Sequence, residues 1–402
     1  MRTVRRVAVL CVLAFAMTSL PAQATDVGLD PTFSDDGRVF VGERFSSANS
    51  LVRYGGDVYA AGTETIDKHS KLFVSKLDDN GVPDPTFGVA GRQLINGQGE
   101  RYFLTGLTVD DSGRVLLVAQ SRHSTLVVRL TADGALDITF SGDGRRLLPG
   151  GAATIFLDPD VVIDSQGRLI VAAMVDTGSP EADVRVWRLL DDGTLDTSWS
   201  GDGLRTINEA DTDWMDAVAV DARDRVLIGS DYAQSGALIY RLQVNGSLDS
   251  TFSDDGVATF RLVKKAWTFP LRIDVGLDEQ ITVAAAGFGD NLYGSARLTA
   301  DGQLDRSYGD AGVIGLTCQL ECLPTWGDAS GGKVAILVDP YGWKDGRLRI
   351  ALIGKDGTDI EQLSVDPFSS SDAGSAYAIE IDGQRTLIAG DNNKRAFVAR
   401  LE

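Results

Sequence analysis

The chain has 402 residues, with 38 Lys or Arg against 57 Asp or Glu, and a formal net charge of −19 at pH 7. An acidic chain without a basic stripe repels phosphate groups, which excludes nucleic acid and anionic membrane surfaces as expected partners. Cationic or neutral ligands suit this charge better. Beyond the first residues no stretch approaches 18 uncharged apolar residues, so no membrane span is expected.

Residues 1–24 predict a cleaved secretory signal peptide. A basic start, "MRTVRR", precedes the apolar run "VAVLCVLAFAMTSL", and "PAQA" supplies small residues at Ala22 and Ala24. Cys11 lies inside the run without the small residues that a lipid-attachment site requires before it. Loss of three arginines and no acids takes the formal charge from −19 to −22. The mature chain, 25–402, is therefore expected in the periplasm or outside a bacterial cell.

An internal repeat dominates the rest of the chain. "LDITFSGDG" at 136 returns as "LDTSWSGDG" at 195, "LDSTFSDDG" at 248 and "LDPTFSDDG" at 29. Units start near residues 30, 84, 137, 196, 249 and 305, and a seventh unit without the string starts near 359. Repeats of this length indicate propellers or solenoids.

Each unit contains four predicted strands. The first follows the DG turn, as in "DGVATF" at 255; the second and third form hairpins such as "AVAVDARDRVLIGS" at 217–230; the fourth ends in a basic residue and Leu, as in "LVVRL" at 126. Runs such as "VLLVA" are apolar on both faces, as expected for sheets packed between neighbours. The sequence therefore predicts an all-β, seven-bladed β-propeller of four-stranded antiparallel blades, with a solenoid as the alternative.

Closure of the ring is expected from the two ends of the chain. The strand at 37–41 should pair beside 396–401, because the chain begins at a repeat corner and ends on a fourth strand. The second strands should line the central channel, as the small residues Ala217 and Ala219 indicate.

The recurring string is interpreted as structural, because it occurs in six units while a binding site breaks symmetry. Its Asp should pair with the basic residue near the end of the fourth strand, and its aromatic residue should fill the core between sheets. The acids are Asp30, Asp84, Asp137, Asp196, Asp249 and Asp305; the bases are Lys76, Arg129, Arg188, Arg241, Arg297 and Arg400; the aromatic residues are Phe33, Phe87, Phe140, Trp199, Phe252 and Tyr308.

Calcium binding by the "SDDG" loops is the alternative for this string. Neither the spacing of a helix-loop-helix calcium loop nor the glycine-rich nonapeptide of calcium-binding β-rolls is present. No metal site and no cofactor are therefore expected, with Ca²⁺ kept as the alternative.

The combined pattern of "LDxTFxxDG", "GRVLVAG" and "VARLxxDG" resembles the delta-60 repeat family of exported bacterial proteins, over essentially residues 28–402. The resemblance implies a β-propeller in an envelope or extracellular setting, and it implies no particular activity. The chain departs from the pattern in unit six, where "LTCQLECLPTW" replaces an apolar strand, and in unit seven.

Residue types with reactive side chains are sparse. Cys318 and Cys322 predict a disulfide in an oxidising compartment, with a metal pair as the alternative. His69 and His123 are isolated in polar loops, and "GDASGG" at 327, which looks like a serine nucleophile segment, aligns with a hairpin turn of the other units. No Walker, HExxH or GxSxG motif occurs.

Carboxylates are the remaining candidates for chemistry. Asp158 and Asp160 in "LDPDVV", and Asp211, Asp213 and Asp216 in "ADTDWMD", form two clusters. Such clusters serve as acid and base in glycoside cleavage or bind Ca²⁺, and a solvated loop is the alternative.

One face of the predicted ring carries loops that differ between units and contain aromatic residues beside charges, which suits sugar rings or peptide side chains. Candidate ligand-binding residues lie before or on the second strands. They are Arg101, Tyr102, Asp158, Asp160, Asp213, Trp214, Lys265 and Trp267, with Arg272, Asp274 and Glu380 adding charge inside the channel.

A ligand-binding or scaffolding module, acting as a monomer on an unidentified glycan, peptide or protein, is the favoured prediction. A glycan-active hydrolase or lyase using the loop carboxylates is one alternative, and a purely structural envelope module is the other.

Overall fold

The computed structural model describes residues 24–67, 69–97, 100–149, 160–175, 183–207, 213–232, 236–264, 266–288, 291–318, 324, 326–339, 347–367, 374–383 and 385–402. All but the last residue of the expected signal peptide, 1–24, lie outside this set. In the described part of the chain no helix is long and apolar enough to cross a membrane.

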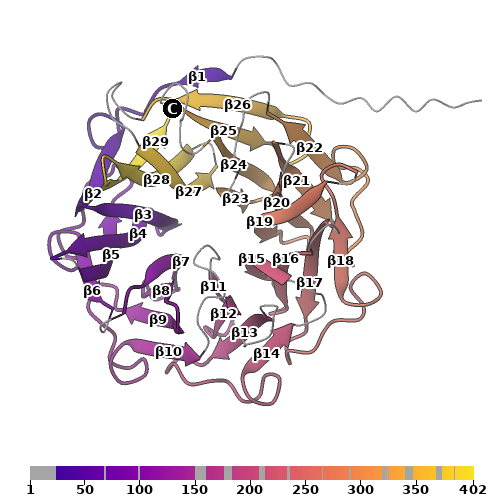
Figure 1. The fold of residues 1–402 in the computed structure, drawn as a ribbon, viewed down its shortest axis with the longest axis horizontal. Coiled ribbons are helices and arrows are strands. Elements are labelled where there is room, and N and C mark those ends of the chain that lie inside the picture. Colours follow the sequence, from indigo (N-terminus) through magenta and orange to yellow (C-terminus); the bar gives the residue numbers. More distant parts are fainter. Residues whose placement is uncertain are drawn as a thin grey trace, which may run out of the picture.

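Seven antiparallel sheets are arranged in a ring around a central axis, as predicted, and the region about this axis is called the channel below (Figure 1). From the channel outward, the first four sheets are β3 (Ser46–Tyr54), β4 (Asp57–Ile66), β5 (His69–Leu77) and β6 (Arg92–Asn96); β7 (Phe103–Val109), β8 (Val115–Gln120), β9 (Ser124–Leu130) and β10 (Arg145–Pro149); β11 (Asp160–Ile163), β12 (Leu169–Val175), β13 (Asp183–Leu189) and β14 (Leu204–Ile207); β15 (Asp213–Val220), β16 (Val226–Tyr232), β17 (Gly236–Leu242) and β18 (Val257–Phe260).

The other three sheets are β19 (Trp267–Val275), β20 (Ile281–Phe288), β21 (Leu292–Leu298) and β22 (Val313–Thr317); β23 (Trp326–Ser330), β24 (Lys333–Asp339), β25 (Leu348–Ile353) and β26 (Ile360–Val365); β27 (Gly374–Asp382), β28 (Arg385–Asn392), β29 (Arg395–Leu401) and β2 (Arg38–Arg44). The strands β3, β7, β11, β15, β19, β23 and β27 surround the channel, each in contact with the next (Figure 1).

Burial on both faces explains the composition of the middle strands. Every residue of β8 and of β12 is buried, because each sheet packs between two neighbours. The hydrophobic clusters accordingly bridge adjacent sheets: one joins β4 and β5 to β7, β8 and β9. These contacts between sheets replace the single core of a sandwich.

Ring closure follows the prediction. β2 pairs antiparallel with β29, with Arg38 opposite Ala399 and Phe40 opposite Phe397. The N-terminal segment therefore supplies the outer strand of the C-terminal sheet and covers the edge that β29 would otherwise expose.

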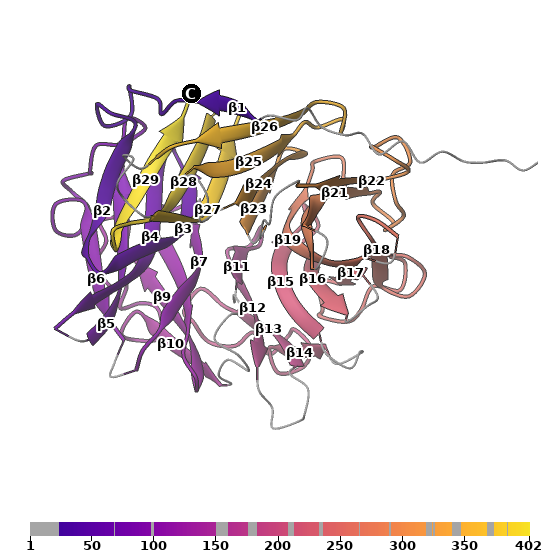
Figure 2. The same ribbon diagram turned by 45° about the horizontal axis from the view of Figure 1, so that its top comes forward.

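A further strand was not predicted. β1 (Thr25–Val27) pairs in parallel with β26, as a fifth strand on the sheet next to the closing one (Figure 2). The N-terminal segment thus contacts two adjacent sheets.

The corner ion pairs are confirmed. In all six, a nitrogen of the basic side chain lies 2.8 Å from an Oδ of the Asp: Lys76–Asp84, Arg129–Asp137, Arg188–Asp196, Arg241–Asp249, Arg297–Asp305 and Arg400–Asp30. The six aromatic residues of the string are fully buried. Five corner arginines also lie over those rings and donate to a backbone carbonyl of the next sheet. The string is therefore a joint between sheets.

Candidate functional site

The channel wall presents unpaired backbone. Each channel strand pairs with one neighbour alone, so half of its N–H and C=O groups point away from its own sheet. Such groups need partners from side chains or solvent. The side chains that follow this edge decide what the channel can bind.

One level of the channel wall breaks the seven-fold symmetry. In every sheet, one residue of the channel strand lies opposite the second residue of the apolar run in the adjacent strand of the same sheet. On β19, β23 and β27 this residue is an acid, and on the other four strands it is uncharged. Around the ring the seven are Val52, Thr108, Val162, Ala219, Asp274, Asp328 and Glu380.

Each of the three acids accepts a hydrogen bond from the next sheet. Asp274 Oδ2 lies 3.1 Å from the amide nitrogen of Gly332, and Asp328 Oδ2 lies 2.9 Å from that of Ile381. Glu380 Oε1 lies 2.8 Å from the amide nitrogen of Arg53 on β3. Three consecutive junctions between sheets are thus joined by a channel carboxylate.

Arg272 supplies the positive charge of this cluster. It precedes Asp274 by two residues on β19, and its Nη1 lies 3.0 Å from Oδ2 of Asp160 on β11, two sheets away. The carboxylates, Asp160 first and then Asp328, Glu380 and Asp274, raise the pKa of Arg272. Its side chain is 42% exposed, so the guanidinium remains accessible from the channel.

Burial favours the protonated form of the three acids. It raises the pKa of Glu380 to about 7, with the Asp328 charge adding to this shift against the hydrogen bond from Arg53. Burial likewise raises the pKa values of Asp274 and Asp328. Within the described residues Glu380 Oε2 is buried without a hydrogen-bond partner. Near neutral pH the cluster can therefore both accept and donate a proton.

Four of the predicted residues thus come together: Asp160, Arg272, Asp274 and Glu380. Asp328 was missed, because "GDASGG" was aligned with a hairpin turn. That alignment was wrong: residues 326–330 form β23, and the turn lies at Gly331 and Gly332. Comparison of the apolar runs alone would have placed Asp328 beside Asp274 and Glu380.

Three other candidates have structural contacts. Tyr102 is 4% exposed, packs in the core between two sheets, and its hydroxyl lies 2.9 Å from Ser124 Oγ. Trp267, the first residue of β19, donates its indole N–H to the buried Asp231. Arg101 is exposed and lies over the ring of Phe103. Tyr102 is therefore part of the core between two sheets, and Trp267 connects β19 to β16 of the preceding sheet.

The remaining candidates are not placed. Asp158, Asp211 and Lys265 lie outside the described residues, as does Cys322. Asp213 and Trp214 begin β15, but their side chains and that of Asp216 are outside the description. Cys318 follows β22 directly, and the disulfide stays a prediction.

The described residues contain neither a candidate cluster of metal-ligating side chains nor a buried histidine. Among the described side chains, no three His, Cys, Asp or Glu residues are placed to hold a metal ion. His69 and His123 are both exposed, and His123 Nδ1 lies 3.5 Å from Glu100 Oε1. The group of Asp160, Arg272, Asp274, Asp328 and Glu380, called the channel cluster from here on, is the best-defined candidate site among the described residues.

Comparison by sequence gives one short match. The family described as "Domain of unknown function (DUF5122) beta-propeller" matches residues 225–252. No curated protein matches the chain. The match agrees with the observed seven-bladed propeller, and the resemblance to delta-60 repeats stays an interpretation.

Comparison by structure finds propellers of different kinds. A catalytically inactive virginiamycin B lyase from Staphylococcus aureus with quinupristin has a TM-score of 0.54 at 12% identity, covering 90% of this chain and 97% of that one. The polysaccharide lyase Uly1 has a TM-score of 0.51 at 10% identity, covering 88% and 89%. Drosophila Plexin A in complex with Semaphorin 1b has a TM-score of 0.50 at 9% identity, covering 94% and 88%. At these identities the likeness shows the fold alone.

Proposed function

We propose that this chain is an exported, monomeric β-propeller that binds a ligand through its channel and the variable loops around it. The channel cluster holds a cationic or hydrogen-bonding group of the ligand, which belongs to a glycan, a peptide or a protein. The function is binding or scaffolding, without catalysis.

The carrying observation is the asymmetry of the channel wall. Asp274, Asp328 and Glu380 occupy a level at which four other sheets have uncharged residues, and Arg272 bridges to Asp160 above them. The fold does not require charges there, since the other sheets form without them. Grouped charges that break the symmetry of a repeat and have shifted pKa values are candidates for ligand recognition.

A glycan-active lyase or hydrolase is the second candidate. Its support is Glu380, whose pKa of about 7 suits proton transfer near neutral pH, beside the positively charged Arg272. The fold likeness to a polysaccharide lyase agrees with this candidate without favouring it.

A thermal-shift screen of the mature protein separates these functions. The panel contains envelope glycans and peptides, including amine-bearing ones, each with and without Ca²⁺, and every mixture is analysed for products. Stabilisation without product supports binding, whereas a product supports the second candidate. If no member of the panel stabilises the protein or yields a product, a structural module is favoured and the proposal is overturned.

Two variants locate the binding site. Asp274→Asn should weaken the stabilisation by a cationic ligand, because it removes one of the channel charges. Asp111→Asn, an exposed acid in a turn outside the channel, is the matched control and should leave the stabilisation unchanged. Equal loss in both variants would mean that net charge, and not the channel, attracts the ligand.

A further inference from the structure

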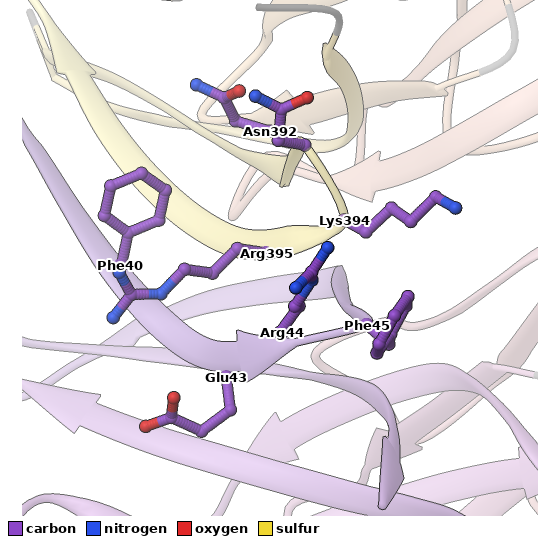
Figure 3. A pocket seen from close by; sticks show the side chains of 8 residues that line it. Phe40, Glu43, Arg44, Phe45, Asn392, Lys394 and Arg395 are labelled. Carbon is purple, nitrogen blue, oxygen red and sulfur yellow. The ribbon is translucent and has the colours of Figure 1, made fainter. Parts of the chain in front are cut away.

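A groove lies at the seam where β2 closes the ring by pairing with β29. It has a volume of about 670 Å³ and lies between the end of β2 and the turn from β28 to β29, far along the sheet from the channel strands (Figure 3). Its lining residues are Phe40, Glu43, Arg44, Phe45, Asn392, Asn393, Lys394 and Arg395.

An irregularity specific to this seam shapes the groove. Phe40 lies opposite Phe397 and Arg44 opposite Arg395, so β2 carries two more residues than β29 between these pairs. The other outer strands, β6, β10, β14, β18, β22 and β26, pair without such a shift. Bulges of this kind reorient side chains and are features of functional edges. The groove is therefore an addition to the repeat.

Cations gather here in an otherwise acidic chain. Arg395 and Arg38 lie 4.4 and 5.3 Å from the centre of the Phe40 ring, and Arg44 and Lys394 lie 5.3 and 5.6 Å from that of Phe45. The two rings, 37% and 50% exposed, thus lie beside four positive charges, of which Arg44, Lys394 and Arg395 line the groove.

These charges are only partly neutralised. Arg395 Nε donates to the carbonyl of Gly42, 3.0 Å away. Within the described part of the chain, Arg44 and Arg395 form no ion pair, and burial raises the pKa of Asp391 against the backbone N–H and the charge of Lys394, which both lower it. Glu43 is the one acid that lines the groove, and Figure 3 shows its carboxylate pointing away from Arg44. The groove therefore offers positive charges that can bind an anion.

Two further observations point to a ligand. Phe45 has a φ of 68°, in the left-handed region that a bulky residue rarely adopts, and such strain is typical of functional positions. Asn392 is 4% exposed and lines the groove, and within the described residues its Oδ1 has no hydrogen-bond partner. A ligand hydroxyl would satisfy that oxygen once the side chain turns toward the groove.

We propose that this groove binds a uronic acid residue of an acidic polysaccharide. The carboxylate of the sugar is held by Arg44 and Lys394, and a ring hydroxyl donates to Asn392. The volume suits one or two sugar rings. Polymers of high charge density, such as nucleic acid, are disfavoured by the net charge of −19. This site is separate from the channel and does not rest on the function proposed for it.

Calorimetric titration of the mature protein with a uronic acid oligosaccharide tests the proposal, with its carboxyl-reduced, neutral form as the comparison ligand. The acidic form should bind, and the neutral form should bind at least ten-fold more weakly. Arg44→Ala combined with Lys394→Ala should weaken binding of the acidic form at least ten-fold. Arg122→Ala combined with Arg306→Ala changes the charge equally at exposed positions elsewhere and should have no such effect.

Equal binding of both sugars, no binding, or equal loss in the two double variants would overturn the proposal. Tighter binding of single-stranded DNA or of anionic lipid vesicles than of the uronic acid oligosaccharide would overturn it as well.

Phe45→Gly gives a second test, in which a loss of binding cannot be the result of unfolding. Glycine adopts the φ of residue 45 without strain, so the melting temperature should stay equal or rise. Binding of the uronic acid oligosaccharide should nevertheless weaken several-fold, because Arg44 and Lys394 lose the ring that positions them. Unchanged binding in this variant would contradict the role of the ring.

Discussion

Arg400 Nε lies 2.8 Å from Asp30 Oδ2, and this contact joins two residues that are 370 positions apart. At five other corners the equivalent ion pair joins the end of one unit to the start of the next, so the ends of the chain meet in the geometry of an ordinary corner. The propeller therefore closes by completing its own repeat with residues from both termini.

This closing pair should contribute measurably to stability. The Arg400 side chain is 3% exposed, so Asp30→Asn removes the nearer of the two carboxylates beside a buried charge. We expect Asp30→Asn and Arg400→Met each to lower the free energy of unfolding by about 1–3 kcal/mol. The double variant should lose less than the sum of the two, as measured by urea denaturation. Additive losses would show that the two side chains do not interact.

Glu380 should make stability depend on pH. Its pKa rises from 4.5 to about 7 on folding, so the folded state binds more protons than the unfolded state between these values. The free energy of unfolding should therefore fall as pH rises from about 4.5 to 7, by at most about 3 kcal/mol. Denaturation at several pH values should show this decline in the wild type and a flatter profile in Glu380→Gln. A wild-type profile that rises through this range would contradict the shift.

Trp267 should control the protonation of Asp231. Burial raises the pKa of Asp231 from 3.8 to about 6, and the hydrogen bond from the Trp267 indole opposes that rise. Trp267→Phe removes the donor, so the pKa should rise further and destabilisation should be larger at pH 8 than at pH 5. The comparison needs denaturation of both proteins at both pH values.

The control for this effect is Asp231→Asn, alone and combined with Trp267→Phe. Without a titrating group at 231, the cost of Trp267→Phe should be the same at pH 5 and pH 8. A cost that still depends on pH would assign the effect to another group.

Cys318 and Cys322 should form an intramolecular disulfide without a redox role. The intact exported protein should be lighter than the dithiol form by two hydrogens, as measured by mass spectrometry without reductant. Reduction should cost only about 2 kcal/mol, because the bond closes a very short loop. Two thiols that react with an alkylating reagent, or metal retained after dialysis, would refute the prediction.

Much of the ring could be predicted from the sequence, because local patterns repeat. The spacing of the Asp–aromatic string marked six of the seven sheets, the strand pattern at the end of the chain marked the seventh, and matched counts of acids and bases identified the corner pairs. Arg400 and Asp30 could be paired because no string follows Arg400 in the sequence and no fourth strand precedes Asp30. These predictions needed only the alternation of strands and turns, which neighbouring residues determine.

Contacts between units that leave no repeated sequence pattern were decided by the tertiary structure alone. β1 joins β26 although three residues give no pattern, Arg272 reaches Asp160 across 112 positions, and the seam groove depends on a bulge in β2. Asp328 was missed because a shift of a few residues in the alignment moves a residue from the hairpin turn to the channel wall. Such contacts depend on the register and closure of the whole ring, which no single repeat contains: the sequence determined the repeating unit, and ring closure decided which charges face one another.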